Sequence, residues 1–424
     1  MYIKKFLITS NNITRDSFIW NMIGSMLNAF QSVIMLMILT RTGSLLEAGI
    51  YTIAYANANL FLMIGKYGMR NFQVSDVKEQ FSFAEYRISR YLTTIIMLLV
   101  SIGYTIYASK TNDYTANKSM CIIWMCLFKL VDSIEDAYHG LYQQKGRLDI
   151  AGKCMTIRMI MTILIFSLSV IFLKSLLPAL IISTIATAII FIIFTAFTYG
   201  EFKCSHENTC KDKIWLLLKV CFPLFLGSFL AFYIGNAPKY AIDSTLNDEL
   251  QACYGFIAMP VFVIGLLNNF IFNPIITKMS FMWNEKDFKS FKKLFLTQII
   301  IIIAITAVCE AGAYLIGIPV LSLMYNTNLV PYKTELLILL LGGGFLALSG
   351  LFVTIITIMR MQKTLLFGYG TVAILAYIAS PIIVKQYAMT GAAVLYLFLM
   401  IFLCILFIIP LLYGIKKSKK SNLS

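Results

Sequence analysis

Charged residues are scarce in this chain of 424 residues. Only 13% of the residues are Asp, Glu, Lys or Arg, whereas 59% are hydrophobic. A soluble domain carries about 25% charged and about 45–50% apolar residues. So little charge cannot cover the surface of a water-soluble enzyme, and the hydrophobic residues occur in long blocks. The composition therefore excludes a soluble protein and indicates one that lies in lipid.

Side chains that serve catalysis or metal binding are also few. The chain has two histidines and contains no HExxH, GxSxG or kinase motif, which leaves little for acid–base catalysis. Its nine cysteines include no CxxC pair and lie mostly in apolar blocks, so no disulfide framework is indicated. Cys204, His206 and Cys210 offer three zinc ligands in a polar loop, without a second cysteine pair. We expect neither an enzyme nor a metal or cofactor site.

Long loops are missing as well. No connection between apolar blocks exceeds about twenty residues, which is too short to fold alone. This argues against a glycosyltransferase, which needs a soluble catalytic region, and against a polysaccharide polymerase, which usually carries a large outer loop. The N-terminus lacks the apolar stretch and cleavage site of a signal peptide, so the first block is expected to be a retained span.

Twelve apolar blocks are long enough to cross a membrane, which takes about 20 residues. We expect an all-α membrane protein with about 12 transmembrane helices. The predicted spans are 17–40, 48–69, 91–108, 119–141, 150–173, 176–198, 214–235, 250–277, 293–316, 333–358, 364–384 and 388–414. The polar loop 199–213 divides them into six-span lobes, 1–198 and 214–424, as in transporters that arose by duplication. A basic tail ends the second lobe.

Loop charge tests this count and orients the chain. With twelve spans, 24 Lys and Arg fall on the loops and termini of one side and seven on the other. Because Lys and Arg concentrate in cytoplasmic loops, both termini are predicted to be cytoplasmic. The net charge of +15 is thus explained by topology, and we expect no nucleic-acid partner.

The fourth span carries the clearest polar pattern. Lys129, Asp132, Asp136, His139 and Gln143 fall within about 80° on one helix face, and Glu135 flanks them. Ionisable groups inside a membrane normally face a bundle interior or a water-filled cavity. Two other interpretations stay open: an amphipathic helix lying on the membrane surface, and internal ion pairing that only cancels charge.

Polar residues share faces in other spans too. We expect substrate contacts from Asn28 in the first span, Asn59 and Lys66 in the second, and Arg158 in the fifth, although small polar residues also suit helix packing. Glu310 stands alone in the ninth span and is either a structural acceptor or a site that exchanges a proton or sodium ion. Gly342-Gly343-Gly344 lacks the GK[ST] of a phosphate loop and predicts close helix packing.

Several stretches resemble the bacterial polysaccharide flippases, which transport lipid-linked O-antigen and capsule repeat units. The resemblance runs along nearly the whole chain. Its motifs are Leu39-Thr40-Arg41 with Glu47-Ala48-Gly49-Ile50-Tyr51, Tyr67-Gly68-Met69-Arg70 with Gln73-Val74-Ser75-Asp76, Asn236-x-Pro238-Lys239-Tyr240-x-Ile242-Asp243 with Tyr254-Gly255, and Pro319-Val320-Leu321-Ser322 with Tyr325.

The resemblance implies a fold in the multidrug/oligosaccharidyl-lipid/polysaccharide exporter superfamily, with two six-helix lobes around a V-shaped cavity (MATE-like). It implies an undecaprenyl-diphosphate-linked oligosaccharide as substrate, moved to the outer leaflet of the bacterial plasma membrane. Polymerase and glycosyltransferases of the same pathway are the expected partners. Arg41, Lys66, Lys129 and Arg158 then become candidate diphosphate or glycan contacts, and Asp132, Asp136 and Glu310 candidates for coupling or charge balance.

One alternative stays open within the same superfamily. The carboxylates of the fourth span add negative charge to the predicted cavity, which suits a drug or organic-cation exporter. In that case Asp132, Glu135 and Asp136 would bind the substrate, and the cations would be incidental.

Overall fold

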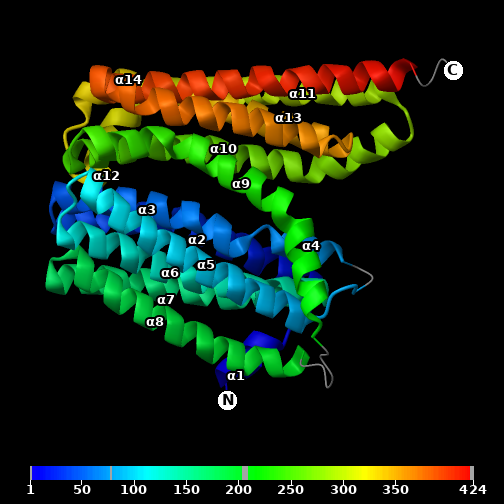
Figure 1. Cartoon of the computed structure of the whole chain (residues 1–424), viewed down its shortest axis with the longest axis horizontal. Coiled ribbons are helices and arrows are strands. Elements are labelled where there is room, and N and C mark those ends of the chain that lie inside the picture. The colour runs from blue at the N-terminus through cyan, green and yellow to red at the C-terminus, as the bar shows by residue number, and fades with distance from the viewer. Residues whose placement is uncertain (1, 77–78, 203–208, 421–424) are drawn as a thin grey trace. The chain divides into compact units, whose positions relative to one another are not determined.

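The computed structural model of the chain describes residues 2–76, 79–202 and 209–420. Within these ranges the regular structure is helical, with no strand. The chain separates into two compact units, Met1–Phe229 and Leu230–Ser424, and Figure 1 shows each as a set of helices lying side by side. The all-α membrane fold predicted from the composition is confirmed.

The first unit contains six long helices and two short ones. The long helices are α2 (Ile13–Thr42), α3 (Leu45–Lys66), α5 (Phe83–Thr111), α6 (Ala116–Gln144), α7 (Leu148–Leu173) and α8 (Leu176–Thr198). The short helix α1 (Tyr2–Ile8) packs on α7 and α8, and the short helix α4 (Met69–Ser75) packs on α5 and α6. Helix α6 packs against α3, α4, α5, α7 and α8, and α2 packs along α7. The most charged span therefore lies among five other helices and not on the membrane surface, so the surface-helix interpretation is wrong.

The second unit is built from α10 (Asp248–Asn284), α11 (Phe288–Gly312), α13 (Lys333–Ile358) and α14 (Gln362–Lys420). A π-helical turn, Ala313–Gly317, and the short helix α12 (Ile318–Tyr325) follow α11. Helix α14 contains a non-helical residue, Ala388, with φ 47° and ψ −128°, so it is two helices joined at a kink. This agrees with the separate spans predicted at 364–384 and 388–414.

Nine helical stretches of the described residues are long and apolar enough to cross a membrane. Helices α6 and α10 are not among them, although they have 29 and 37 residues. At 1.5 Å per residue both are longer than the ≈ 30 Å of a bilayer's hydrocarbon core. With these two and the second half of α14, the helices follow the twelve predicted spans in order.

The break after α3 corrects the second predicted span, 48–69. Tyr67 and Gly68 both adopt left-handed backbone conformations, with φ of 49° and 65°. A left-handed residue ends a helix because it turns the chain away from the axis. Helix α3 therefore stops at Lys66, and α4 starts in a new direction at Met69.

Helix α9 (Lys211–Thr245) belongs to both units, since the division falls at residues 229 and 230. Its first half packs on the first unit: Leu217 and Cys221 join a buried cluster with Met69, Phe81 and Tyr86. The ring of Phe225 stacks on Tyr67 at 4.7 Å. This unit thus extends past the loop 199–213, where the sequence places the lobe boundary.

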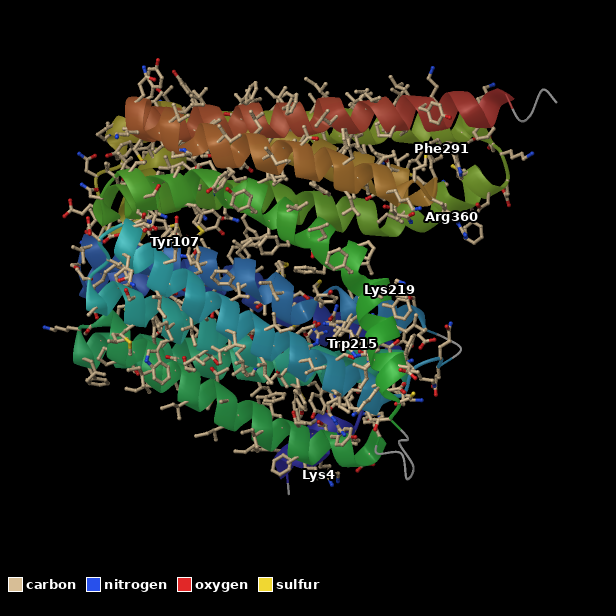
Figure 2. The ribbon with its side chains drawn as sticks, in the orientation of Figure 1. Lys4, Tyr107, Trp215, Lys219, Phe291 and Arg360 are labelled. Carbon is tan, nitrogen blue, oxygen red and sulfur yellow. The ribbon has the colours of Figure 1, made fainter. Side chains whose placement is uncertain are left out.

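Large apolar side chains stand on the outside of the helices. Tyr107 on α5 and Trp215 on α9 are 65% and 72% exposed and point away from their helices (Figure 2). Lys219 is also exposed, on the first half of α9. Such an exterior suits lipid, because apolar surface needs no burial in protein when the solvent is hydrocarbon.

The glycine triplet of α13 provides close packing in the second unit. A Cβ added at Gly342 would lie 2.6 Å from Tyr396, and one at Gly344 would lie 2.7 Å from Thr306. The intervening Gly343 lies against Val261, where an added Cβ would be 3.0 Å away. The triplet therefore lets α13 approach α14, α11 and α10, as predicted from its lack of a phosphate-loop sequence.

Candidate functional site

A polar cavity of about 240 Å³ lies inside the first unit. Its charged lining comes from α3, α4, α6 and α7, and Asn28 adds a polar group from α2. The charged residues around it are Lys66, Arg70, Lys129, Asp132, Glu135, Asp136 and Arg158. The polar stripe predicted on the fourth span thus faces a cavity.

Arg158 of α7 is the most tightly held cation in this cavity. Its side chain is 1% exposed, and its Nε donates to Oε1 of Glu135 at 2.9 Å. Its Nη2 donates to Oδ1 of Asp132 at 2.7 Å and to Oε2 of Glu135 at 2.6 Å. These are short charge-assisted bonds, which fix the orientation of the guanidinium plane.

Lys129 is held within its own helix. Its Nζ donates to Oδ2 of Asp132 at 2.9 Å and to Oε1 of Gln31 on α2 at 3.4 Å. The ammonium also lies 5.0 Å from the ring centre of Tyr55 on α3. Ion pairing within the fourth span, which the sequence left open as an alternative to a cavity, is therefore present between Lys129 and Asp132, and the pair forms part of the cavity wall.

Asp136 connects two arginines from other helices to α6. Its Oδ2 accepts from Nη2 of Arg90 on α5 at 2.9 Å, and its Oδ1 accepts from Nη1 of Arg70 on α4 at 3.4 Å. Arg90 is 1% exposed and also donates to the carbonyl oxygen of Gly65 at 3.0 Å, at the end of α3. Arg70 donates to Oε1 of Gln143 at 3.0 Å. Asp136 thus helps to join α4, α5 and α6.

The periodicity of α6 explains this arrangement. Residues three and four apart on a helix lie on one face, so Lys129, Asp132, Glu135 and Asp136 occupy successive turns next to each other. Each carboxylate then reaches a cation from another helix: Asp132 and Glu135 contact Arg158 of α7, and Asp136 contacts Arg90 of α5 and Arg70 of α4. A buried carboxylate without such a partner is costly, so the cations of the neighbouring helices keep this charged helix stable inside the unit.

Lys66 differs from the other cations. It is half-buried at the C-terminal end of α3 and lines the cavity. In the described part of the chain it has no hydrogen bond and no ion pair within 4.0 Å. Lys129, Arg158 and Arg70 each have a carboxylate within that distance. Lys66 therefore offers a charge to the cavity that the neighbouring carboxylates have not neutralised by direct contact.

Buried polar atoms without partners lie at the same space. Nη1 of Arg158 and Nε2 of His139 belong to residues that line the cavity, and neither atom has a hydrogen-bond partner among the described residues. The same holds for Nε2 of Gln31, whose Oε1 accepts from Lys129 of the cavity wall. His139 lies 3.7 Å from Glu135. Buried donors in native proteins normally have a partner, be it protein, water or ligand. These atoms favour an acceptor-rich molecule in the cavity.

The charge balance of the cavity is positive. Four cations and three carboxylates line it, and Arg90 adds a fifth cation behind Asp136. Each carboxylate contacts at least one arginine or lysine. The net electrostatic effect therefore favours an anion over a cation.

The structure brings most of the predicted site residues together. Asn28, Asn59, Lys66, Lys129, Asp132, Asp136 and Arg158 all line the cavity. Arg41 does not: it is exposed at the last turn of α2, 13 residues beyond Asn28, or about 20 Å along the helix.

Glu310 lies in the second unit. It is half-buried at an apolar pocket of about 220 Å³ between α11 and α13, with Thr306 and Gly344 nearby. No hydrogen bond or ion pair reaches its side chain from the rest of the described chain. The apolar surroundings of Glu310 therefore differ from the charged cavity around α6.

Arg70 was not predicted as a site residue, because it follows the second span and counted as a loop charge. The turn at Tyr67 and Gly68 brings α4 back onto α6, and Arg70 with it. A glycine at position 68 indicates a turn in the sequence, but it does not reveal the direction in which the chain turns. The zinc ligands considered in the loop, Cys204 and His206, lie outside the described residues.

Comparison with known proteins supports a family. The profile of the polysaccharide biosynthesis protein family matches residues 14–281. The "Capsular polysaccharide biosynthesis protein CapF" of Staphylococcus aureus is 24% identical over 383 residues, which is 89% of this chain and 94% of that protein.

Solved structures show the same fold at low sequence identity. A multidrug resistance MATE family transporter of the MOP superfamily, in an inward-facing conformation, matches with a TM-score of 0.69 at 12% identity, covering 95% of this chain and 99% of that one. A MOP superfamily transporter from Pyrococcus furiosus, described as having a binding pocket of reverse polarity, matches with a TM-score of 0.59 at 14% identity over 98% of each chain. With the family profile and the helices of spanning length, these matches lead to one conclusion: the chain belongs to the polysaccharide biosynthesis protein family and is a multi-pass membrane protein with a MATE-like fold.

Proposed function

We propose that the protein is a flippase for undecaprenyl-diphosphate-linked oligosaccharide repeat units. It moves them from the cytoplasmic to the outer leaflet for synthesis of a surface polysaccharide such as capsule or O-antigen, by alternating access of its two lobes. The observation that carries the proposal is the polar cavity of the first unit, where cations exceed carboxylates and buried donors lack acceptors.

A diphosphate suits this cavity because it is a compact anion with many acceptor oxygens. Lys66 supplies a cation without a direct partner, and Nη1 of Arg158 supplies a free donor. Each charge-assisted hydrogen bond is worth roughly 1.5–3 kcal/mol. Lys129 and the remaining atoms of Arg158 are held by Asp132 and Glu135. They therefore contribute to the positive electrostatic potential of the cavity, while Lys66 contacts the diphosphate directly.

Uncharged groups beside the cations suit sugar hydroxyls. Asn28 and Asn59 line the same cavity, together with Tyr55. Nδ2 of Asn59 donates to the carbonyl oxygen of Tyr55 at 2.8 Å, so its Oδ1 faces other partners. We assign the glycan end of the substrate to these side chains.

A drug or organic-cation exporter is less well supported. The carboxylates of the fourth span would have to be free to bind such a cation, and Asp132, Glu135 and Asp136 are each paired with an arginine or lysine. We expect a deletion strain to lose its surface glycan and keep its tolerance of toxic cations; the reverse result would favour the exporter.

Ion coupling belongs to the proposal through Glu310. A half-buried carboxylate with no partner in the described chain is suited to exchange a proton or sodium ion. We expect Glu310→Gln to stop transport that is driven by an ion gradient while leaving substrate binding unchanged. Equal gradient-driven transport in the variant and the wild type would remove Glu310 from the mechanism.

We place the protein in the bacterial plasma membrane with both termini in the cytoplasm, on the 24-to-7 bias of loop Lys and Arg. Polymerase and glycosyltransferases of the same pathway are the proposed partners. Labelling of single cysteines added at the termini of the chain in intact cells tests the orientation, since cytoplasmic thiols stay unlabelled by impermeant reagents.

The central experiment replaces Lys66 in the purified, reconstituted protein. Lys66→Gln should weaken binding of undecaprenyl diphosphate by about tenfold or more, the fold-change of one lost charge-assisted bond. Undecaprenyl monophosphate should be affected less, because it presents fewer acceptor oxygens. Lys66→Arg should retain most of the binding.

The matched control is Lys219→Gln, which removes an exposed lysine of the same unit and should leave binding unchanged. Surface polysaccharide in cells should fall with Lys66→Gln at constant protein level. Wild-type diphosphate binding and wild-type export in Lys66→Gln would refute the cavity as the diphosphate site.

A further inference from the structure

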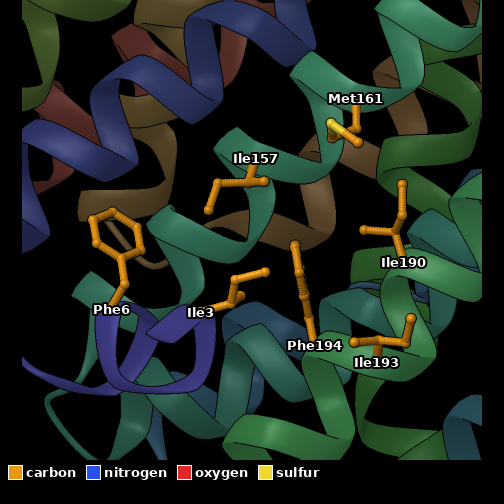
Figure 3. Close-up of a pocket in the computed structure, with 7 residues that line it drawn as sticks. All are labelled: Ile3, Phe6, Ile157, Met161, Ile190, Ile193 and Phe194. Atoms are coloured by element: carbon orange, nitrogen blue, oxygen red, sulfur yellow. The ribbon is translucent and has the colours of Figure 1, made fainter. Parts of the chain in front are cut away.

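The N-terminal helix α1 forms one wall of a second, apolar groove in the first unit. The groove has a volume of about 460 Å³ and is open to the outside of the bundle. It is lined by Ile3 and Phe6 of α1, Ile157 and Met161 of α7, and Ile190, Ile193 and Phe194 of α8 (Figure 3). Every lining side chain is apolar, so the groove offers no hydrogen bond and suits a hydrocarbon chain.

A polar pocket of about 400 Å³ continues the groove, because Phe6 lines both. Three cations, Lys5, Arg15 and Lys153, border it. One carboxylate, Asp16, lies among them and accepts from Oγ of Ser10 at 2.8 Å and from Nε of Arg15 at 3.4 Å. The pocket therefore carries more positive than negative charge.

Helix α1 is fixed in place by α7. Nζ of Lys153 donates to the carbonyl oxygens of Thr9 at 2.9 Å and Phe6 at 3.3 Å, and Nη2 of Arg147 donates to that of Ile8. Leu7 is fully buried. The groove is thus a preformed feature of the bundle and not a loose contact of the chain end.

The residues around the polar pocket are also of the kind found at the depth of the lipid headgroups. Trp20 lines the polar pocket and packs edge-on against Phe6, with ring centres 5.7 Å apart. Tryptophan concentrates at the membrane–water interface. The predicted orientation puts this end on the cytoplasmic side, where the leaflet carries anionic lipids.

We infer that the groove and pocket together bind one anionic membrane phospholipid, with an acyl chain along Ile157, Met161 and Ile193 and the phosphate beside Lys5 and Arg15. The site combines an apolar groove with a basic pocket, so it selects a molecule that has both parts. This binding is separate from transport through the polar cavity, to which none of these residues contributes.

The test titrates the full-length protein in detergent with phosphatidylglycerol or phosphatidylcholine and counts bound lipids by native mass spectrometry. Wild type should retain phosphatidylglycerol preferentially. Because a basic residue near anionic lipid is worth about fivefold in binding, K5Q/R15Q should lower that preference by about tenfold to thirtyfold. The control K110Q/K174Q removes two exposed charges, at the C-terminal ends of α5 and α7, and should keep the preference for phosphatidylglycerol.

A second variant separates the acyl-chain site from the charge. Ile193→Trp fills the groove and should lower retention of both lipids without changing their ratio. Glycerol phosphate, the headgroup without chains, should displace nothing. An unchanged lipid preference in K5Q/R15Q, or displacement by glycerol phosphate alone, would overturn the inference. Binding of undecaprenyl phosphate with no binding of phosphatidylglycerol would overturn it too, in favour of the substrate's own carrier.

Discussion

Arg158 provides the sharpest test of how the cavity is held together. Its guanidinium makes three bonds of 2.6–2.9 Å to Asp132 and Glu135 while only 1% exposed. In Arg158→Met, Asp132 keeps Lys129 at 2.9 Å, whereas the only other side chain paired with Glu135 among the described residues is the imidazole of His139 at 3.7 Å. Leaving one partner of a buried pair behind costs about 3–5 kcal/mol. We expect a loss of that size in the free energy of unfolding.

The double variant Arg158→Met/Glu135→Gln removes the stranded charge as well. It should therefore be more stable than the sum of the two single effects predicts, by about 1–3 kcal/mol, as expected of residues in direct contact. Unfolding in mixed micelles of a denaturing and a mild detergent measures these differences. Arg360→Met, which removes an exposed arginine of the second unit, is the control. Strict additivity, or an Arg158→Met protein as stable as wild type, would show that Glu135 does not depend on Arg158.

Two further substitutions test the supports around the cavity. Gly68→Ala places a Cβ 2.7 Å from Leu224 at a residue with φ of 65°. The free energy of unfolding should therefore fall by about 1–3 kcal/mol in the same micelle assay. An unchanged value would mean that α9 moves away from the added methyl group at this point. Asp149→Asn weakens the ion pairs of a fully buried carboxylate with Arg147 at 2.9 Å and Lys153 at 3.8 Å, the two residues that hold α1. Trypsin should then cut after Lys4 and Lys5 faster than in wild type, and an equal rate would show that α1 is held without them.

The sequence was sufficient for the membrane fold and for much of the cavity. Long apolar blocks reveal spans without any knowledge of packing, and the 3.6-residue period shows that Lys129, Asp132 and Asp136 share a face. The pairing of Lys129 with Asp132 is local to one helix, and ion pairing within this span was one of the alternatives that the sequence left open. These features depend on residues that are close in the sequence, and the helical period is enough to relate such residues in space.

Contacts between helices could not be predicted from the sequence. That Asp132 and Glu135 hold Arg158 depends on the approach of α7 to α6, and no spacing within one span reveals it. Arg70 reaches Asp136 only because two left-handed residues turn α4 back. The carboxylates therefore looked like an argument against a cationic cavity, whereas the structure uses them to orient its arginines.

Helix α9 imposes an order on biogenesis. Leu217, Cys221 and Phe225 complete the packing around Met69, Tyr86 and Tyr67, yet they are synthesised after the loop that follows the sixth span. A nascent chain halted at that loop holds six inserted helices whose wall is still open. The first unit thus becomes complete only when the seventh span has entered the bilayer, so the two halves of this protein are not independent products of translation.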